Sequence, residues 1–183
     1  MDNGASSYRR FLDGDDNGLV EIIRDYKDGL ILYLNSFVRN IDIAEELTEE
    51  TFVKIVIKKP KYNEKSSFKT WLYAIGRNVT LDHLKHRRKS DLQAEIFQNT
   101  DEESLEKDYI RKEDKILLHK AIQKLKPEYR QILWLTYFED FSNKETAKLM
   151  KKSVHNIETL VYRARKALKT ELEREGLTYE DIY

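Results

Sequence analysis

The 183-residue sequence contains no cysteine, only two prolines and six glycines, and its formal net charge at pH 7 is zero. Without cysteine, the chain cannot form a disulfide framework, a thiolate zinc site or a cysteine nucleophile, and it gives no sign of an oxidising compartment. The six glycines are too scattered to build a phosphate-binding loop. These absences exclude several classes of enzyme and lead us to predict no cofactor.

Long hydrophobic runs are also missing. The longest strongly apolar, uncharged stretch is GLILYLNSFV at residues 29–38, which is far below the roughly 18 residues that a membrane span needs. The first residues, MDNGASSYRRFLDGDDNG, have no apolar segment of the kind found in signal peptides. The sequence therefore predicts a cytosolic protein that does not insert into a membrane.

Metal-binding and catalytic patterns are weak. Of the four histidines, only His83 and His86 are close neighbours. They lie inside a basic helical segment that supplies no thiolate, so we predict no metal site. We likewise predict no catalytic residues, and a chain that is not an enzyme.

The zero net charge is a sum of blocks of opposite sign. Residues 1–53 hold five Lys or Arg against twelve Asp or Glu, and residues 54–89 hold eleven against two. Residues 90–114 hold three against nine, and residues 144–174 hold nine against four. Two basic blocks separated by acidic ones indicate two surfaces for a polyanion and at least one surface that avoids it.

Apolar residues recur at helical spacing in the first half of the chain. The spacing predicts long amphipathic helices over residues 19–37 and 44–56, the second of which ends before Pro60. The segment PKYNEKSS, which starts at Pro60, is predicted to be a loop. Ser66 or Ser67 then caps a third long helix, which ends in KHRRK.

The second half has shorter helices. Residues 90–108 lose the periodicity and turn acidic, which predicts a linker. Helices follow through residues 116–125 and from Pro127, which suits a first helical turn. The segment SNKE at residues 142–145 is a capping box. The short helix that it opens, the turn KKSVHN and the basic helix after it form a helix-turn-helix pattern.

Three segments resemble regions 2 and 4 of the bacterial sigma-70 family: DIAEELTEETFVKI, FKTWLYAIGRNVTLDHLKHRRK and LKPEYRQILWLTYFEDFSNKETAKLMKKSVHNIETLVYRARKALKTEL. Only an acidic linker lies between the two regions, as in the extracytoplasmic-function (ECF) group of sigma factors. The resemblance covers about residues 15–175, with both signatures in the family's order and spacing. It implies an all-α fold of two small helical domains, residues 1–89 and 113–183, joined by a flexible acidic linker at 90–112.

The resemblance also implies a function. A sigma factor binds core RNA polymerase and directs promoter-specific initiation by recognising the −35 and −10 elements and assisting strand opening. The implied partners are core RNA polymerase, double- and single-stranded promoter DNA, and an anti-sigma factor that holds the protein inactive. Two other hypotheses are a helix-turn-helix transcription regulator with a helical N-terminal interaction domain, and an interaction module whose charged faces bind protein. The regulator accounts for residues 142–170 but not for the loop and basic aromatic helix at 60–89.

The acidic helix is the implied contact with polymerase. In the family, the segment similar to AEELTEETF binds a helical coiled coil on the largest polymerase subunit. The resemblance carries this role to Glu45, Glu46, Leu47, Glu50 and Phe52. Glu49 stands where the family usually has glutamine. On residue type alone, an acidic amphipathic helix is more often just a solvated face.

The loop and the third helix are the implied contacts with the opened −10 element. Proteins hold single-stranded DNA with cations along the backbone and aromatic faces on which bases stack. In the family, this loop forms a pocket for a base flipped out of the non-template strand. The candidates are Lys61, Tyr62, Asn63, Lys65, Ser66, Lys69, Tyr73, Arg77 and Asn78. Phe68 and Trp71 share an apolar stripe and are assigned to the core, whereas Tyr73 lies off it and is predicted to face DNA.

The last helix is the implied reader of the −35 element, because a recognition helix projects its first turns into the major groove. The candidates are Lys152, Ser153, His155, Asn156, Glu158, Thr159, Tyr162, Arg163 and Lys166. Glu158 stands where many relatives carry Lys or Arg. Its carboxylate could accept from a cytosine amine or pair with Arg163 or Tyr162. Without the resemblance, YRARKAL could equally be a solvated cationic helix face.

Overall fold

The computed structural model describes residues 3–91, 118 and 120–174 of the chain, and all regular structure in these residues is helical. The chain divides into two compact units, Met1–Asp101 and Glu102–Tyr183, which we call unit 1 and unit 2. The predicted all-α fold is confirmed. Apart from its first two residues, the predicted linker at 90–112 lies outside the described residues.

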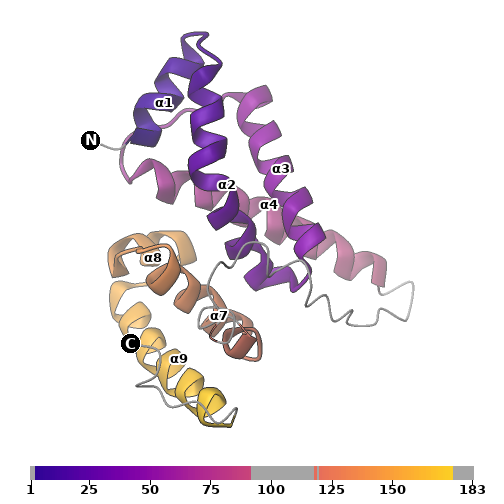
Figure 1. Cartoon of the computed structure of the whole chain (residues 1–183), viewed down its shortest axis with the longest axis vertical. Coiled ribbons are helices and arrows are strands. Elements are labelled where there is room, and N and C mark those ends of the chain that lie inside the picture. The colour runs from indigo at the N-terminus through magenta and orange to yellow at the C-terminus, as the bar shows by residue number, and fades with distance from the viewer. Residues whose placement is uncertain (1–2, 92–117, 119, 175–183) are drawn as a thin grey trace. The chain divides into compact units, whose positions relative to one another are not determined.

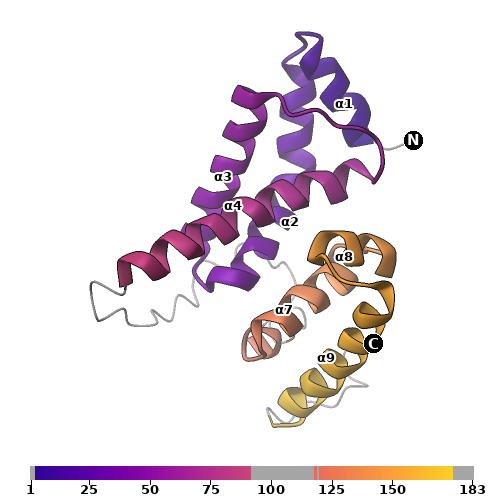
Figure 2. The same ribbon diagram turned by 180° about the vertical axis from the view of Figure 1, so that it is seen from behind.

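The described part of unit 1, residues 3–91, forms four helices, which are labelled in Figure 1. They are α1 (Asn3–Leu12), α2 (Asn17–Val38), α3 (Ile41–Lys58) and α4 (Phe68–Asp91). α2 packs against each of the other three, and α4 crosses α2 and α3 (Figure 2). The core between them contains Ile22, Leu30, Leu34, Ile55 and Leu72, all nearly or fully buried.

The helix boundaries in unit 1 follow from local chemistry. The Asn40 side chain caps α3 by accepting a hydrogen bond from the backbone N–H of Ile43 at 2.8 Å. α3 ends at Lys58 and is capped by Lys59, which has left-handed backbone angles and lies directly before Pro60. The Ser67 hydroxyl accepts from the backbone N–H of Thr70 at 3.3 Å, as expected of a residue that caps α4. The predicted cap at Ser67 is therefore confirmed.

The sequence pattern did not predict α1. Its buried residues, Ala5, Tyr8 and Phe11, have helical spacing, but Ser, Gly and Arg surround them and no longer apolar stripe results. A side chain at Gly18 would overlap the backbone of Ser7, so glycine there lets α1 and α2 approach closely.

An ionic cluster strengthens the pairing of α1 with α2. Arg10 of α1 forms ion pairs with Asp15 at 2.8 Å and with Glu21 at 3.0 Å. The Ser7 hydroxyl also donates to Glu21 at 2.6 Å. The Ser7 hydrogen bond and the Arg10 guanidinium together lower the pKa of Glu21. These contacts hold α1 on the first turns of α2.

Unit 2 contains α7 (Pro127–Leu133), a π-helix (Trp134–Phe138), α8 (Asn143–Met150) and α9 (Val154–Arg174). Pro127 lies in the first turn of α7, as predicted. The π-helix was not predicted, and in it the ring of Trp134 stacks on Phe138 with centroids 4.1 Å apart. The apolar segment that begins at Pro127, PEYRQILWLTYFED, is therefore not one continuous α-helix, because its second half contains the π-helix.

The helix-turn-helix of unit 2 is confirmed. Ser142 and Glu145 form both hydrogen bonds of the capping box at the start of α8. α8 ends at Lys151, whose left-handed backbone angles turn the chain into α9. α9 packs on α7 and α8 through a buried stripe of Ile157, Ala164, Leu168 and Leu172.

Candidate nucleic-acid interface

The segment between α3 and α4, residues 59–67, is not helical, and we refer to it as loop 59–67. Side-chain hydrogen bonds hold its backbone in place, because the loop has no regular series of backbone–backbone hydrogen bonds. The Tyr62 hydroxyl donates to the carbonyl of Ser66 at 2.5 Å. The Asn63 side-chain oxygen accepts from the backbone N–H of Lys65 at 3.2 Å, as in an Asx turn. The loop therefore has a defined shape.

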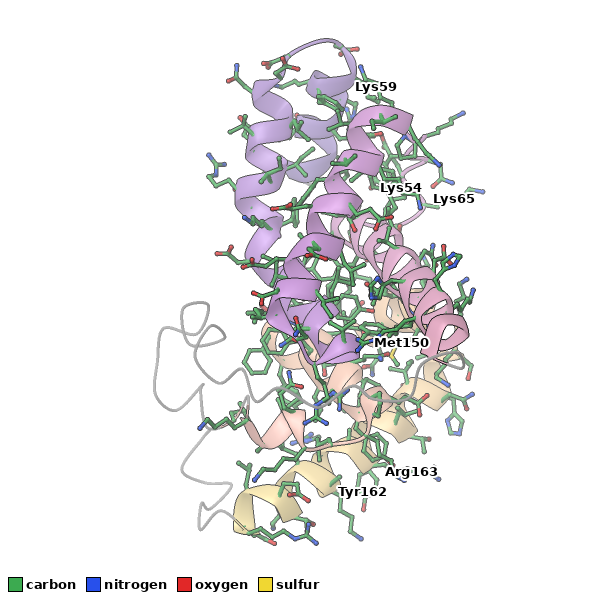
Figure 3. All side chains as sticks on the ribbon, turned by 90° about the vertical axis from the view of Figure 1, so that its right-hand side faces the viewer. Lys54, Lys59, Lys65, Met150, Tyr162 and Arg163 are labelled. Atoms are coloured by element: carbon green, nitrogen blue, oxygen red, sulfur yellow. The ribbon has the colours of Figure 1, made fainter. Side chains whose placement is uncertain are left out.

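Cationic side chains lie on and around this loop. Lys59, Lys61 and Lys65 are exposed, and Asn63 is exposed between them. In Figure 3, Lys54, Lys59 and Lys65 lie toward the same side of unit 1. Cations grouped in this way can follow a phosphate backbone.

Aromatic rings support the loop from within unit 1. The half-buried ring of Tyr62 lies 5.6 Å from Phe68 and 5.3 Å from Trp71, measured between centroids. Phe68 is fully buried, as predicted, and Trp71 is half-buried. Tyr62 is thus an aromatic ring of the loop with access to solvent and a fixed orientation.

The prediction that Tyr73 offers its ring to DNA is wrong. Its side chain is 0% exposed, and the ring stacks on Tyr33 of α2 with centroids 5.3 Å apart. Since α4 crosses both α2 and α3, it is buried over a wider face than one apolar stripe suggests. A residue off the first stripe therefore still lies in the core.

The remaining −10 candidates lie along the start of α4. Lys69 is half-buried and its Nζ lies 5.7 Å from the centroid of the Tyr73 ring. Arg77 is half-buried, and its Nε has no hydrogen-bond partner among the described residues. Asn78 is exposed. Apart from the buried Tyr73, the predicted set thus lies on the loop and on the first half of α4.

Two of the predicted polymerase contacts are buried. Leu47 is 2% exposed and Phe52 is 6% exposed, so both pack mainly into the core of unit 1. Glu46 and Glu50 are exposed and Glu45 is half-buried. Leu47 therefore has little surface to offer a partner, whereas part of the Phe52 side chain lines an apolar groove of unit 1.

An apolar groove beside these glutamates was not predicted. It is lined by Ile23 and Lys27 of α2 and by six residues of α3: Thr48, Glu49, Phe52, Val53, Val56 and Ile57. Ile57 is 74% exposed. The sequence signal was present in VKIVIKK, which has more β-branched apolar residues than one buried stripe can use. We refer to this feature as the α2–α3 groove.

The predicted −35 residues lie around the solvent face of α9. Ser153, His155, Asn156, Glu158, Tyr162, Arg163 and Lys166 are exposed, and Thr159 is half-buried. Tyr162 is 71% exposed, and Tyr162 and Arg163 project from α9 in Figure 3. The Ser153 hydroxyl accepts from the backbone N–H of Asn156 at 3.2 Å and so caps the helix. The first turns of α9 therefore present mostly polar side chains to solvent.

The side-chain contacts of two residues in this set, Lys152 and Glu158, could not be deduced from the sequence. Lys152 pairs with Glu128 of α7 at 2.9 Å, which ties the turn before α9 to the start of α7. Among the described residues, Glu158 forms no ion pair with Arg163. The two lie five positions apart, a separation that does not bring side chains together on a helix. Glu158 instead lines a groove with Tyr162, Arg165 and Lys166.

Comparison with known proteins accounts for both units. The family model "Sigma-70 region 2" matches residues 22–90, and "Sigma-70, region 4" matches residues 115–168. The ECF RNA polymerase sigma factor SigC of Mycobacterium tuberculosis is 30% identical over 146 residues, which cover 78% of this chain and 77% of the relative. The chain belongs to the sigma-70 family, in the ECF group.

A further relative agrees in sequence, and two solved structures agree in fold. The ECF RNA polymerase sigma factor SigW of Bacillus subtilis is 26% identical over 171 residues, which cover 87% of this chain and 91% of the relative. The fold resembles that of the sigma factor RpoE bound to the anti-sigma factor NepR from Bartonella quintana, with a TM-score of 0.68, 21% identity and coverage of 84% of this chain and 95% of the other. CnrH in complex with the cytosolic domain of CnrY gives a TM-score of 0.64 at 20% identity, with coverage of 94% and 96%.

The family assignment decides between the sequence hypotheses. The chain is a sigma factor, so the principal interpretation is confirmed over the regulator and the interaction module. The part of the chain that the structure describes contains no group of three or more His, Cys, Asp or Glu able to hold a metal ion. Within those same residues, no helix is both long enough and apolar enough to cross a membrane.

Proposed function

We propose that this sigma factor reads the −35 element with α9, holds the opened −10 strand on loop 59–67 and the start of α4, and binds core polymerase through α3. The observation that carries the proposal is the exposure pattern of α9. Its apolar stripe is fully used against α7 and α8, while the predicted −35 residues remain exposed or half-buried on the other face. A helix arranged in this way can enter a major groove.

Chemistry along α9 supports direct readout. Asn156 can pair with adenine and Arg163 with guanine, the bidentate contacts that these side chains make best. Lys166 extends from the same face and suits a phosphate contact. Lys152 is less suited, because it already pairs with Glu128. Glu158 remains a candidate acceptor for a cytosine amine, since it has no ion pair with Arg163.

Loop 59–67 has the chemistry of a single-strand site. Lys61 and Lys65 supply cations, and Asn63 and Ser66 supply polar groups for a base edge. Tyr62 takes the place of Tyr73 as the candidate stacking ring, because it is half-exposed and Tyr73 is buried. Extruding a base from a duplex costs a few kcal/mol, so a loop with a preset shape favours the opened state.

The polymerase contact is proposed to use the exposed glutamates of α3 together with the α2–α3 groove. Glu46, Glu49 and Glu50 present negative charge, and Val53 and Ile57 present apolar surface next to it. A basic amphipathic helix complements such a surface. Leu47 contributes by fixing α3 in the core, and Phe52 both packs in the core and lines the groove. A basic amphipathic partner of this kind agrees with the helical coiled coil that the family binds on the largest polymerase subunit.

Regulation and location follow from this function. The related RpoE structure contains the anti-sigma factor NepR, and we extend a partner of that kind to this chain. A protein that acts with core polymerase on promoter DNA works in the cytoplasm. The polymerase performs the chemistry, so this chain is proposed to have no catalytic activity of its own.

In-vitro transcription with purified core polymerase and a promoter library tests the proposal. The expected result is initiation at a small set of promoters that share −35 and −10 sequences, and none from core polymerase alone. A chain that binds duplex DNA but never converts core polymerase to specific initiation would contradict it. That outcome would instead favour a helix-turn-helix regulator.

A further inference from the structure

Helix α1 contacts the loop that we assign to the −10 strand. The hydroxyl of Tyr8 donates a hydrogen bond to the carbonyl of Pro60 at 2.7 Å, joining residues 52 positions apart. Tyr8 is 1% exposed, and burial raises its pKa to about 12. The hydroxyl therefore keeps its proton, and can donate, throughout the neutral pH range. In Figure 2 the chain between α3 and α4 runs past α1.

The Tyr8 bond differs in kind from the other side-chain bonds of the loop. The bond that Tyr62 donates to Ser66 and the bond that the Lys65 N–H donates to Asn63 are local, since they span four and two positions. Local bonds fix the internal shape of a turn. A bond from another helix fixes where that turn lies relative to the body of the unit.

The rings below the loop connect the same two tyrosines. The ring of Tyr8 lies 5.1 Å from Trp71 and 5.6 Å from Phe68. The ring of Tyr62 lies 5.3 Å and 5.6 Å from these same two residues. Trp71 and Phe68 are thus held between a residue of α1 and the candidate stacking ring of the loop. A shift of Tyr8 would be passed to Tyr62 through well-packed rings.

Two contacts at the edge of α1 add to this arrangement. The Nζ of Lys59 lies 5.1 Å from the centroid of the Phe11 ring, in cation–π range. Arg9 pairs with Glu64 at 3.5 Å, and Glu64 has left-handed backbone angles with φ of 58°. α1 therefore meets the loop near its beginning and again at its turn.

We infer that α1 is a brace for loop 59–67 and that Tyr8 is its positioning residue. A loop without a backbone ladder must lose conformational freedom when it binds a strand. A loop that is already held in place loses less and binds more tightly. The effect on DNA rests on the proposed −10 role of the loop, whereas the effect on loop order does not. The family match starts at residue 22, after α1.

The test compares Tyr8→Phe with Tyr33→Phe in the full-length chain. Both changes remove one hydroxyl from a buried ring of unit 1. The Tyr33 hydroxyl has no hydrogen-bond partner among the described residues, so its loss should leave the loop unchanged. For Tyr8→Phe we expect amide hydrogen exchange within residues 61–67 to become about 3- to 10-fold faster, the range that corresponds to one hydrogen bond.

The functional readout uses both variants with core polymerase. The probe is the non-template single strand of the strongest promoter that the wild-type protein selects from a library. We expect the Tyr8→Phe holoenzyme to bind this strand about 3- to 10-fold more weakly than wild type. Affinity for core polymerase should stay unchanged, because Tyr8 belongs neither to the exposed glutamates of α3 nor to the lining of the α2–α3 groove. Tyr33→Phe should match wild type in both measurements.

The outcomes separate this inference from the proposed function. If exchange at residues 61–67 is the same in the two variants, α1 is not a brace and the inference fails. If exchange rises only in Tyr8→Phe but strand binding does not fall, Tyr8 does not position the loop for DNA. If the wild-type holoenzyme does not prefer the promoter strand over a scrambled strand, the −10 role of the loop fails, and the exchange result still decides the brace.

A surface charge reversal gives a second test that should not affect folding. Arg9 and Glu64 are both mostly exposed, so Arg9→Glu replaces an attraction by a repulsion without disturbing the core. We expect a smaller loss of strand binding, about 1.5- to 3-fold, as is usual for exposed pairs. Adding Glu64→Arg should restore binding. A double variant no better than Arg9→Glu would contradict a contact between α1 and the loop at this point.

Discussion

The two units carry their candidate DNA contacts on different kinds of backbone. In unit 2 the contacts lie on α9, where helical periodicity alone fixes which side chains share a face. In unit 1 most of them lie on loop 59–67, whose position depends on α1 and on a cluster of aromatic rings. The recognition surface of unit 2 is therefore locally determined, and that of unit 1 depends on residues far away in the sequence.

The largest effect is expected from removing the loop chemistry altogether. Replacing Tyr62, Asn63 and Lys65 by alanine should reduce open-complex formation by about 100-fold, because loss of stacking costs roughly 1–3 kcal/mol per base and the cation and the amide are lost with it. Core binding should remain, since the α2–α3 groove and the glutamates of α3 are untouched. Permanganate footprinting of unpaired thymines measures the opening. Normal melting by the triple variant would show that the loop does not hold the strand.

The contrast between units matches what the sequence could and could not predict. Capping chemistry and 3.6-residue periodicity predicted α8 and α9, including the box formed by Ser142 and Glu145. They did not predict α1, because Tyr8 and Phe11 form too short an apolar pattern to stand out. The position of the loop could not be predicted either, since it depends on a contact between residues 8 and 60.

The error at Tyr73 has the same origin. A helical stripe shows which residues share one face, but not how many neighbours the helix crosses. Because α4 packs on α2 and on α3, Tyr73 and Phe68 are both buried. The burial of Leu47 has a related origin, since a family motif points to a helix without saying which of its residues support the fold.

The second largest effect should come from Arg163 on α9. Arg163→Ala should cost about 1–3 kcal/mol at one base pair of the −35 element and little at the others, as loss of a bidentate base contact does. Arg174→Ala is the matched control, because it lies on the same helix beyond the first turns. Binding selections on randomised −35 sequences measure both. Equal sequence preferences in Arg163→Ala and wild type would mean that α9 does not read bases with this residue.

Removing the N-cap of α8 tests whether the structure of unit 2 depends on local contacts within that unit. Ser142→Ala removes the capping hydroxyl of α8 and should lower the stability of unit 2 by about 1 kcal/mol. Thr170→Ala, an exposed change on α9, should have little effect. Hydrogen exchange on the full chain can follow each unit separately. Equal loss of protection in unit 1 would show that the two units are not independent.

The smallest effects are expected from charges that follow the DNA backbone. Lys166→Ala should weaken all sites alike and reduce the slope of log affinity against log salt by about 0.9, the value for one lost phosphate contact.

Glu158→Lys should act in the opposite direction on affinity and salt slope, because an ammonium replaces a carboxylate on the same face of α9. It should also change the −35 preference if Glu158 contacts a base. Selections at two salt concentrations separate these effects. A changed slope with unchanged preference in Glu158→Lys would make Glu158 a bystander near phosphates, whereas an unchanged slope in both variants would place this face of α9 away from the groove. In that case unit 2 would lose its locally determined recognition surface, and the contrast with the braced loop of unit 1 would no longer hold.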